Sequence, residues 1–169
     1  MHDTGEPLDI ILSYCHLNLQ NDALTKYVQQ FQDRAQVKQL VAASPLNMGL
    51  LTPRGPPAWH PSSPELRQCA LKANDICAAK GWKLGLPDLA LGFAYRKAKE
   101  LDLPTVVGLS TPEEVHETFR VWREVNSEEE QVSKRLAVET AVVDEFRAHR
   151  CLGRSWPSPP ESFEYSRAE

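Results

Sequence analysis

The segment with the strongest signal for chemistry is a turn from a predicted strand into a predicted helix at residues 107–114, with the sequence VGLSTPEE. Gly108 allows a ligand to approach the backbone closely. A helix that begins behind Thr111 offers N–H groups at the positive end of its dipole. Such a turn is typical of an anion site, and phosphate is its common occupant. In the alternative interpretation, Thr111 and Glu114 only cap the helix, with Pro112 at its first position.

A second turn of interest follows Ala43, where the apolar segment 39–43 runs into SPLNMG at residues 44–49. In α/β sheets, ligands bind at the carboxyl ends of the strands, and in eight-stranded β/α barrels the phosphate site lies in the loops after the last two strands. We therefore expect the turns after Ala43 and Val107 to be neighbours at one edge of a sheet. Phosphate is the ligand expected at this edge.

The acidic residues beside the turn at 107–114 indicate which dinucleotide is preferred. Glu113 and Glu114 stand where a protein that binds a 2′-phosphate usually has arginine or lysine. A carboxylate suits hydrogen bonds to ribose hydroxyls better than contact with a second phosphate group. If a dinucleotide binds here, the sequence therefore favours NAD over NADP.

Tyr14 follows another predicted strand, at the end where ligands bind in α/β folds. Its ring is suited to packing on a flat cofactor. The neighbouring pair Cys15 and His16 suggests nucleophilic catalysis, but adjacent residues on a strand point to opposite faces. We therefore do not expect a catalytic dyad there.

A proline-rich segment, TPRGPPAWHPSSP at residues 52–64, excludes both a helix and a central strand. It carries an arginine, a tryptophan and a histidine: Arg54, Trp59 and His60. On a stiff loop these side chains are candidates to line a substrate pocket. A surface loop held by its prolines is the alternative.

The elements that must position these residues alternate along the chain. Short apolar runs predict strands at residues 8–13, 39–43 and 105–109, the first two of the buried kind that parallel sheets use. Apolar residues at helical spacing and capping signals predict helices at residues 22–34, 63–80, 86–100, from 111 onward and at 128–149. This order predicts an α/β fold with a parallel sheet and right-handed crossovers. Three strands leave both sheet edges open, so the chain reads as part of a larger sheet or barrel.

Composition, length and charge indicate a globular protein and disfavour nucleic-acid-binding and membrane-spanning classes. The 169 residues are 41% hydrophobic and 25% charged, as in globular proteins, but the chain is short of the roughly 250 residues of a closed (β/α)₈ barrel. The net charge of -4 gives no basic field to attract nucleic acid or an anionic membrane. No apolar run approaches the roughly 20 residues of a membrane-spanning helix, and the first residues lack the pattern of a secretory signal.

Four scattered cysteines show no spacing typical of a metal site, and we expect no metal. Buried free thiols are favoured over disulfides or ligands. A reducing compartment, and hence a cytoplasmic location, is predicted.

Several segments, in the correct order, resemble the carboxyl-terminal half of an aldo/keto reductase. The most specific is VAASPLNMGLLT at residues 41–52, which is similar to the turn after the seventh barrel strand of that family. The segments LSYCH (12–16) and GPPAWHP (55–61) resemble its branch of NAD-dependent L-galactose and D-arabinose 1-dehydrogenases. The segment VVGLSTPEEVHE (106–117) resembles the eighth strand with its cofactor-binding helix.

The resemblance implies a partial (β/α)₈ TIM barrel made of about the last three β/α units. Residues 8–125 would form this half of the barrel domain, 126–150 a helical extension and 151–169 a flexible tail. The implied activity is NAD(P)-dependent oxidation of an aldose, of the D-arabinose or L-galactose type, at C1 to the lactone. This chain would supply the cofactor-binding half.

The resemblance also assigns residues to the cofactor. The phosphate and ribose contacts would come from the two turns: Ser44, Leu46, Gly49, Gly108, Ser110 and Thr111. Glu114 and Glu117 would lie near the adenosine. Tyr14 stands where many members have a glutamine at the nicotinamide, and Ala43 stands where many have a stacking tyrosine.

The family's proton donor is a tyrosine supported by lysine, aspartate and histidine from the first half of the barrel, and no segment here matches those motifs. No catalytic residue is therefore assigned, and we expect the isolated chain to turn over no sugar. A second hypothesis is a catalytically inactive, truncated product that folds only on pairing, with itself or with another half-barrel, through its open sheet edges. A third is a small nucleotide-binding module that uses only residues 108–114.

Overall fold

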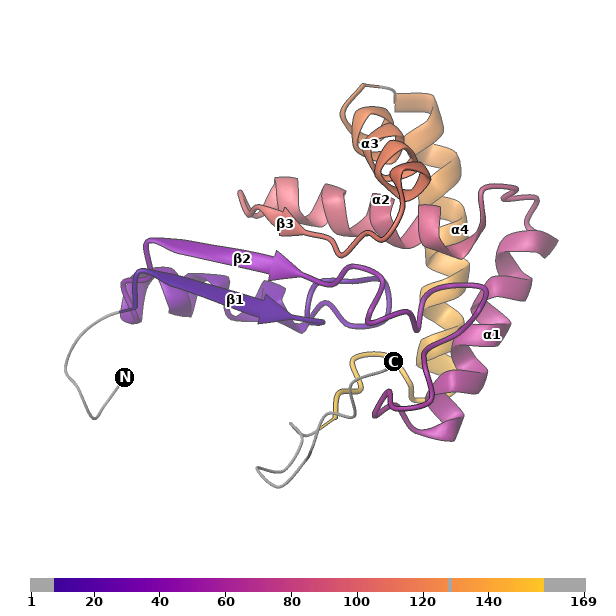
Figure 1. Cartoon of the computed structure of the whole chain (residues 1–169), viewed down its shortest axis with the longest axis horizontal. Helices are drawn as coiled ribbons and strands as arrows, with labels where there is room; N and C mark the ends of the chain where they lie inside the picture. Colours follow the sequence, from indigo (N-terminus) through magenta and orange to yellow (C-terminus); the bar gives the residue numbers. More distant parts are fainter. Residues whose placement is uncertain (1–7, 128, 157–169) are drawn as a thin grey trace.

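A small parallel sheet organises one end of the molecule. The computed structural model describes residues 8–127 and 129–156. Strands β1 (Ile10–Tyr14), β2 (Gln39–Ala43) and β3 (Thr105–Val106) lie in the order β1-β2-β3, and both pairings are parallel (Figure 1). The predicted α/β fold, a partial β/α barrel, is thus confirmed. The third strand is shorter than the predicted 105–109, because only its first two residues pair with β2.

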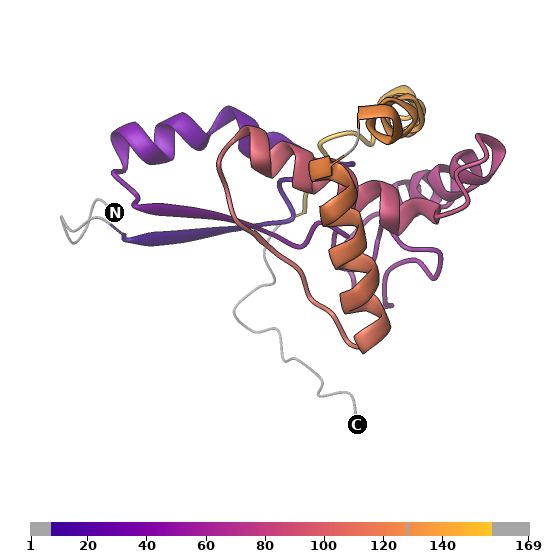
Figure 2. The same ribbon diagram turned by 90° about the horizontal axis from the view of Figure 1, so that it is seen from above.

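Helical segments cover one face of this sheet, as Figure 2 shows. The predicted helix at 22–34 is wrong as a continuous α-helix. It divides into a 3₁₀ turn, η1 (Ala23–Lys26), and a π turn, η2 (Gln30–Arg34). Leu24 and Val28 remain packed in one core cluster with Leu40 of β2. Tertiary packing, rather than regular helical geometry, therefore sets the path of this segment.

The opposite face of the sheet is open within the described part of the chain. Ile10, Leu12 and Tyr14 point to this face at alternate positions of β1 and are 65%, 50% and 52% exposed. Val106 of β3 is also exposed. The prediction that the first strand is buried on both faces is therefore wrong, because the described helices pack on one side only.

Four α-helices complete the fold: α1 (Pro64–Ala79), α2 (Gly85–Glu100), α3 (Pro112–Ser127) and α4 (Glu129–Ala148). Each lies where a helix is predicted. Ser63 caps α1 by accepting a hydrogen bond from the Leu66 N–H, with Pro64 at the first position. Helices α1, α2 and α4 enclose the main apolar core, in which Leu89 and Phe146 are fully buried. This core lies beside the sheet rather than under it (Figure 1).

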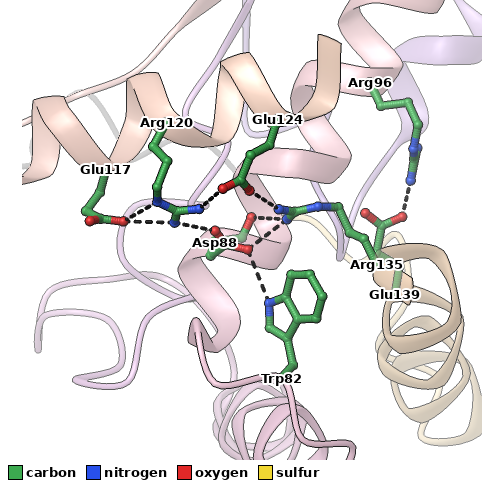
Figure 3. A network of polar contacts seen from close by, with 8 residues as sticks. All are labelled: Trp82, Asp88, Arg96, Glu117, Arg120, Glu124, Arg135 and Glu139. Carbon is green, nitrogen blue, oxygen red and sulfur yellow. Dashed lines mark hydrogen bonds and ion pairs between the residues drawn. The ribbon is translucent and has the colours of Figure 1, made fainter. Parts of the chain in front are cut away.

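A buried carboxylate joins α2, α3 and α4 (Figure 3). Asp88 of α2, 5% exposed, accepts hydrogen bonds from Arg120 of α3 at 2.7 Å and pairs with Arg135 of α4 at 2.9 Å. Arg135 also donates to the Asp88 carbonyl oxygen at 2.7 Å, and Glu124 contacts both guanidinium groups. The Trp82 indole N–H donates to the same carboxylate at 3.2 Å. These bonds fix the helix that follows β3 against the rest of the molecule.

Gly92 of α2 provides the space for this network. A Cβ atom added there would overlap the Arg135 guanidinium. The absence of a side chain at this position therefore allows a long cationic side chain to cross α2 and reach Asp88.

Asp88→Ala leaves Arg135 buried without its main acceptor. We expect the free energy of unfolding to fall by ~3 kcal/mol, as for other buried ion pairs that lose one partner. Urea unfolding measures this change. The matched control is Asp144→Ala, which removes an exposed pair with Arg147 and costs less than ~1 kcal/mol. Equal losses in the two variants would contradict the role assigned to Asp88.

Candidate functional site

The two turns singled out in the sequence are neighbours at the carboxyl edge of the sheet. Ala43 is in register with Val106, and the Ser44 N–H donates to the Val106 carbonyl at 3.1 Å. On the other side of β2, the Cys15 N–H donates to the Ala43 carbonyl at 3.0 Å. The predicted adjacency is confirmed. It follows from parallel pairing, which sends all three strand ends to the same edge.

The turn at 44–49 has an unusual backbone. Ser44, Asn47 and Met48 have φ values of 63°, 53° and 53°, and Gly49 has φ 86°. Residues other than glycine rarely adopt this left-handed region, and clusters of such residues concentrate at functional sites. The Ser44 hydroxyl accepts a hydrogen bond from the Met48 N–H at 3.0 Å and closes the turn. This conformation is typical of a backbone shaped for a ligand.

Buried amides support the turn from behind, and sequence reasoning missed them. Gln20, fully buried, accepts a hydrogen bond from the Asn47 side chain at 2.9 Å. Its own amide donates to the carbonyl oxygens of Cys151 and Arg154 at 2.7 and 3.1 Å. Cys151 and Arg154 of the predicted tail are thereby bonded to the turn's support, and residues 157–169 lie outside the described residues. A polar pair 27 positions apart leaves no local signal in a single sequence.

The turn at 107–114 contains the predicted capping box. The Glu114 N–H donates to the Thr111 hydroxyl at 3.2 Å, and the Glu114 carboxylate accepts from the Ser110 N–H at 2.7 Å. Gly108 is exposed, and a Cβ atom added there would meet nothing within 4 Å. The backbone at Gly108 thus has room for a ligand, whereas a phosphate at Ser110 must compete with the Glu114 carboxylate.

Two exposed side chains, Tyr14 and Val106, flank the buried Ala43 at this edge. Tyr14, Ala43 and Val106 occupy paired positions on the three strands. The half-exposed Tyr14 ring therefore lies on the same side of the sheet as Ala43 and Val106, the strand residues that lead into the two turns. Leu46 and Gly49 are partly buried in the turn at 44–49, and Glu117 lies farther along α3, where it pairs with Arg120 at 2.8 Å.

The three candidate residues of the proline-rich loop differ in their exposure to solvent. Arg54 and Trp59 are exposed, whereas His60 is 3% exposed. The His60 Nδ1 accepts from the Ser62 N–H at 3.0 Å, so Nε2 carries the proton and donates to the Asn47 carbonyl at 3.1 Å. In this structure His60 joins the loop to the turn at 44–49. Its predicted contact with substrate stays a prediction.

Arg67 of α1 holds the same loop in place. Its guanidinium donates to the His60 carbonyl at 2.6 Å and to the Ser62 carbonyl at 3.3 Å. Because His60 in turn contacts Asn47, the loop, α1 and the turn at 44–49 form one connected unit. Sequence reasoning did not identify Arg67, since nothing in its helical context marks it as a loop support.

Outside the two turns, the described residues form a groove but gather no set of metal ligands. A groove of about 400 Å³ lies between α2 and α4, but it carries ion pairs between Arg96 and Glu139 and between Arg147 and Asp144, far along the chain from either turn. In residues 8–127 and 129–156, no three His, Cys, Asp or Glu side chains gather as metal ligands would. Within the same residues, no helix has the length and apolar character needed to span a membrane. All four cysteines are free and buried, as predicted.

Comparisons with known proteins agree with the geometry. The family model described as "Aldo/keto reductase family" matches residues 3–137. The chain is 35% identical over 120 residues to L-galactose dehydrogenase of Arabidopsis thaliana. The aligned region covers 71% of this chain and 36% of that protein. It is 34% identical over 153 residues to D-arabinose 1-dehydrogenase of Saccharomyces cerevisiae. That aligned region covers 89% of this chain and 44% of that protein. The chain thus spans less than half the length of these two curated relatives.

Burial of His60 predicts a specific dependence of stability on pH. Desolvation, the largest cause, lowers the pKa of this imidazole below its ordinary value of 6.5, against the opposing effect of the Asn47 carbonyl. The unfolded chain therefore takes up a proton near pH 6.5, while the folded chain does so only at lower pH. The resulting stability is present above about pH 6.5 and is lost as the pH falls.

We expect the free energy of unfolding to fall more in the wild type than in His60→Gln when the pH is lowered from about 7.5 to about 5.5. Urea unfolding at both pH values measures the difference. Leu71→Gln, at an exposed position of α1 that carries no titratable group, is the control and should keep the pH dependence of the wild type. An identical pH dependence in His60→Gln and the wild type would show that His60 does not titrate as described.

Proposed function

Because the chain belongs to the aldo/keto reductase family, whose members are oxidoreductases that use nicotinamide cofactors, we propose that it binds NAD at the carboxyl edge of its sheet. It supplies the cofactor side of an enzyme that oxidises an aldose at C1 to the lactone. The observation that carries this proposal is the hydrogen bond between Ser44 and Val106, which places two turns suited to phosphate side by side.

The residues at the two turns fit a dinucleotide. The left-handed backbone at Ser44 and Gly49 and the open space at Gly108 provide a surface on which a diphosphate can approach main-chain atoms. Ser110 and Thr111 stand at the beginning of α3, the end of a helix that favours anions, and a phosphate gains the Ser110 N–H by displacing the Glu114 carboxylate. Leu46 lies between Ser44 and Gly49 and gives the same turn an apolar contact.

The exposed ring of Tyr14 is the group of this chain best placed to pack against the nicotinamide, because it stands on the open face at the strand end. Bound NAD would supply the hydride acceptor for oxidation at C1 of the sugar, and Tyr14 would hold its nicotinamide ring in place. The chain's own contribution is to hold and orient the cofactor, since no residue here is assigned to move the hydroxyl proton.

The substrate class rests on the two relatives, whose names specify L-galactose and D-arabinose. We propose a sugar of this kind as the small-molecule partner. Arg54 and Trp59 project from the loop that follows the turn at 44–49, and the arginine and the indole suit hydroxyls and the apolar face of a sugar ring. His60 contributes by fixing this loop through Asn47.

The preference for NAD rests on charge. Glu113, Glu114 and Glu117 are exposed at the beginning of α3. They repel the extra phosphate of NADP and can accept hydrogen bonds from ribose hydroxyls. A cytoplasmic location agrees with four free thiols, and the net charge of -4 favours neither a nucleic acid nor an anionic membrane as partner.

Titration of the full chain with each dinucleotide tests the cofactor site. We expect NAD to bind more tightly than NADP, and Gly108→Ala to weaken NAD binding by about tenfold, ~1.4 kcal/mol, because the new methyl group enters the space for the diphosphate. Isothermal titration calorimetry gives the dissociation constants. The urea midpoint of Gly108→Ala should stay unchanged, since the added Cβ meets no protein atom.

Lys80→Ala, at an exposed position after α1, is the control and should bind NAD as the wild type does. Tighter binding of NADP would overturn the preference, and unchanged affinity in Gly108→Ala would remove the second turn from the site. We also expect no production of NADH from L-galactose or D-arabinose by this chain alone.

A second function is favoured by the open face of the sheet. Ile10, Leu12, Tyr14 and Val106 present an apolar surface next to two sheet edges that are unpaired within the described residues. Such a face is suited to bury itself against another protein surface. The alternative proposal is therefore a non-catalytic chain that associates through this sheet, with a second copy or with another half-barrel.

Sedimentation of the purified chain tests this alternative. If the sheet mediates self-association, the wild type should sediment as a dimer or larger species at micromolar concentration, and Leu12→Glu should shift it to the monomer, because a carboxylate on the open face resists burial. Leu71→Glu places the same charge at a 46% exposed leucine of α1 and should leave the association unchanged. A compact monomeric wild type would count against self-association.

A further inference from the structure

Two buried cysteines from distant parts of the chain meet beside the main core. Cys69 lies in the middle of α1, and Cys151 follows the end of α4. Their Sγ atoms are 2.8 Å apart, although the residues are 82 positions apart in the sequence. Cys69 is 3% exposed and Cys151 fully buried. We propose that this pair is a redox modification site, in which a peroxide converts the two thiols into a disulfide that ties the segment after α4 to α1.

The geometry makes this pair different from the other two thiols. A disulfide has an S–S bond of about 2.05 Å, so the two sulfurs need to approach by less than about 1 Å. Cys77 lies two turns farther along α1 and is buried as well, and Cys15 is buried in the turn after β1. Among the described residues, a close approach of two sulfur atoms occurs between Cys69 and Cys151.

The position of Cys151 is fixed from two further sides. Its N–H donates to the Phe146 carbonyl at 2.7 Å, which turns the chain back at the end of α4. Its carbonyl accepts from the Gln20 amide at 2.7 Å. Because both ends of the prospective bond are held by the fold, little chain entropy remains to be lost when the bond forms, which favours the oxidised form.

The step balances with hydrogen peroxide as the oxidant. The sulfur of one thiol attacks the peroxide, the O–O bond breaks, and a sulfenic acid and one water form. The second thiol then attacks the sulfenic sulfur, the S–S bond forms, and a second water leaves. Two thiols are oxidised by two electrons in total, and the peroxide is reduced to two waters.

Burial sets the rate of this step. Desolvation, the largest cause, raises the pKa of Cys69 to about 12, with further contributions from Cys151 and Glu145. Because the thiolate is the reactive form, oxidation is slow near neutral pH and accelerates as the pH rises. The pair therefore reacts slowly with peroxide near neutral pH, and the disulfide forms on prolonged exposure.

The disulfide also constrains the support of the turn at 44–49. Gln20 bonds to Cys151 on one side and to Asn47 on the other, and the Gly153 N–H donates to the Gln20 carbonyl at 2.8 Å. Tying Cys151 to α1 thus immobilises the segment on which Gln20 depends. The disulfide itself does not rest on the proposed function, and its test measures the bond and the stability alone.

The experiment uses the full chain, treated with hydrogen peroxide, then alkylated in denaturant and digested with trypsin. Cys69 falls in the peptide QCALK, Cys151 in CLGR and Cys77 in ANDICAAK, so mass spectrometry distinguishes every pairing. We expect a cross-linked QCALK and CLGR species, two hydrogens lighter than the sum of the peptides, that dithiothreitol removes. Oxidation should raise the Tm by roughly 5–10 °C.

Cys69→Ser should abolish both the cross-link and the rise in Tm, and Cys77→Ser, at a buried thiol of the same helix, should leave both intact. The Tm of each reduced variant shows that it is folded. A pairing of Cys69 or Cys151 with any other cysteine would overturn the proposal. So would independent oxidation to sulfinic acids, or two thiols that remain open to alkylation after peroxide treatment.

Discussion

The parallel register of three short strands is the constraint on which the candidate site depends. Parallel pairing sends every strand end to the same edge, so the turns after Tyr14, Ala43 and Val106 lie next to each other although long helical segments separate them in the chain. An antiparallel pairing would place one of the turns at the opposite edge. The site therefore follows from the topology of the sheet, and the side chains at the edge refine it.

The helices act on the site through buried polar groups as much as through apolar packing. Asp88 holds α3 by way of Arg120, and α3 in turn fixes where the turn at 107–114 ends. Gln20 and His60 hold the turn at 44–49 in place through their hydrogen bonds with Asn47. Asp88, Gln20 and His60 are buried and hydrogen-bonded, an arrangement that specifies one geometry because an unpaired buried group is costly. The two turns are thus supported by separate networks.

Much of the fold and the adjacency of the two turns could be predicted from the sequence. Strand β2, the caps at Ser63 and Thr111 and the adjacency of the two turns follow from local patterns and from the rules of parallel sheets. The division of the predicted helix at 22–34 and the shortness of β3 could not be predicted from local patterns, because contacts with the sheet determine both. The supports Gln20 and Arg135 were also missed, since each acts on a residue far away in the chain. Arg67 bonds the nearby loop at His60, but nothing in its helical context marks it as a support. Local periodicity carries no information about such partners.

The exposed strand β1 has a consequence for how the chain behaves at high concentration. Its sequence IILSY has high β propensity and no charge, and its outer edge is unpaired within the described residues, which is the signature of a segment prone to aggregation. The residues just before β1 and β2 limit this hazard: Asp9 and Lys38 form an exposed ion pair at 2.6 Å. Charges beside an apolar strand act as gatekeepers that disfavour stacking of identical chains. The strand that aligns the candidate site therefore also carries a risk of aggregation, which these two charges counter.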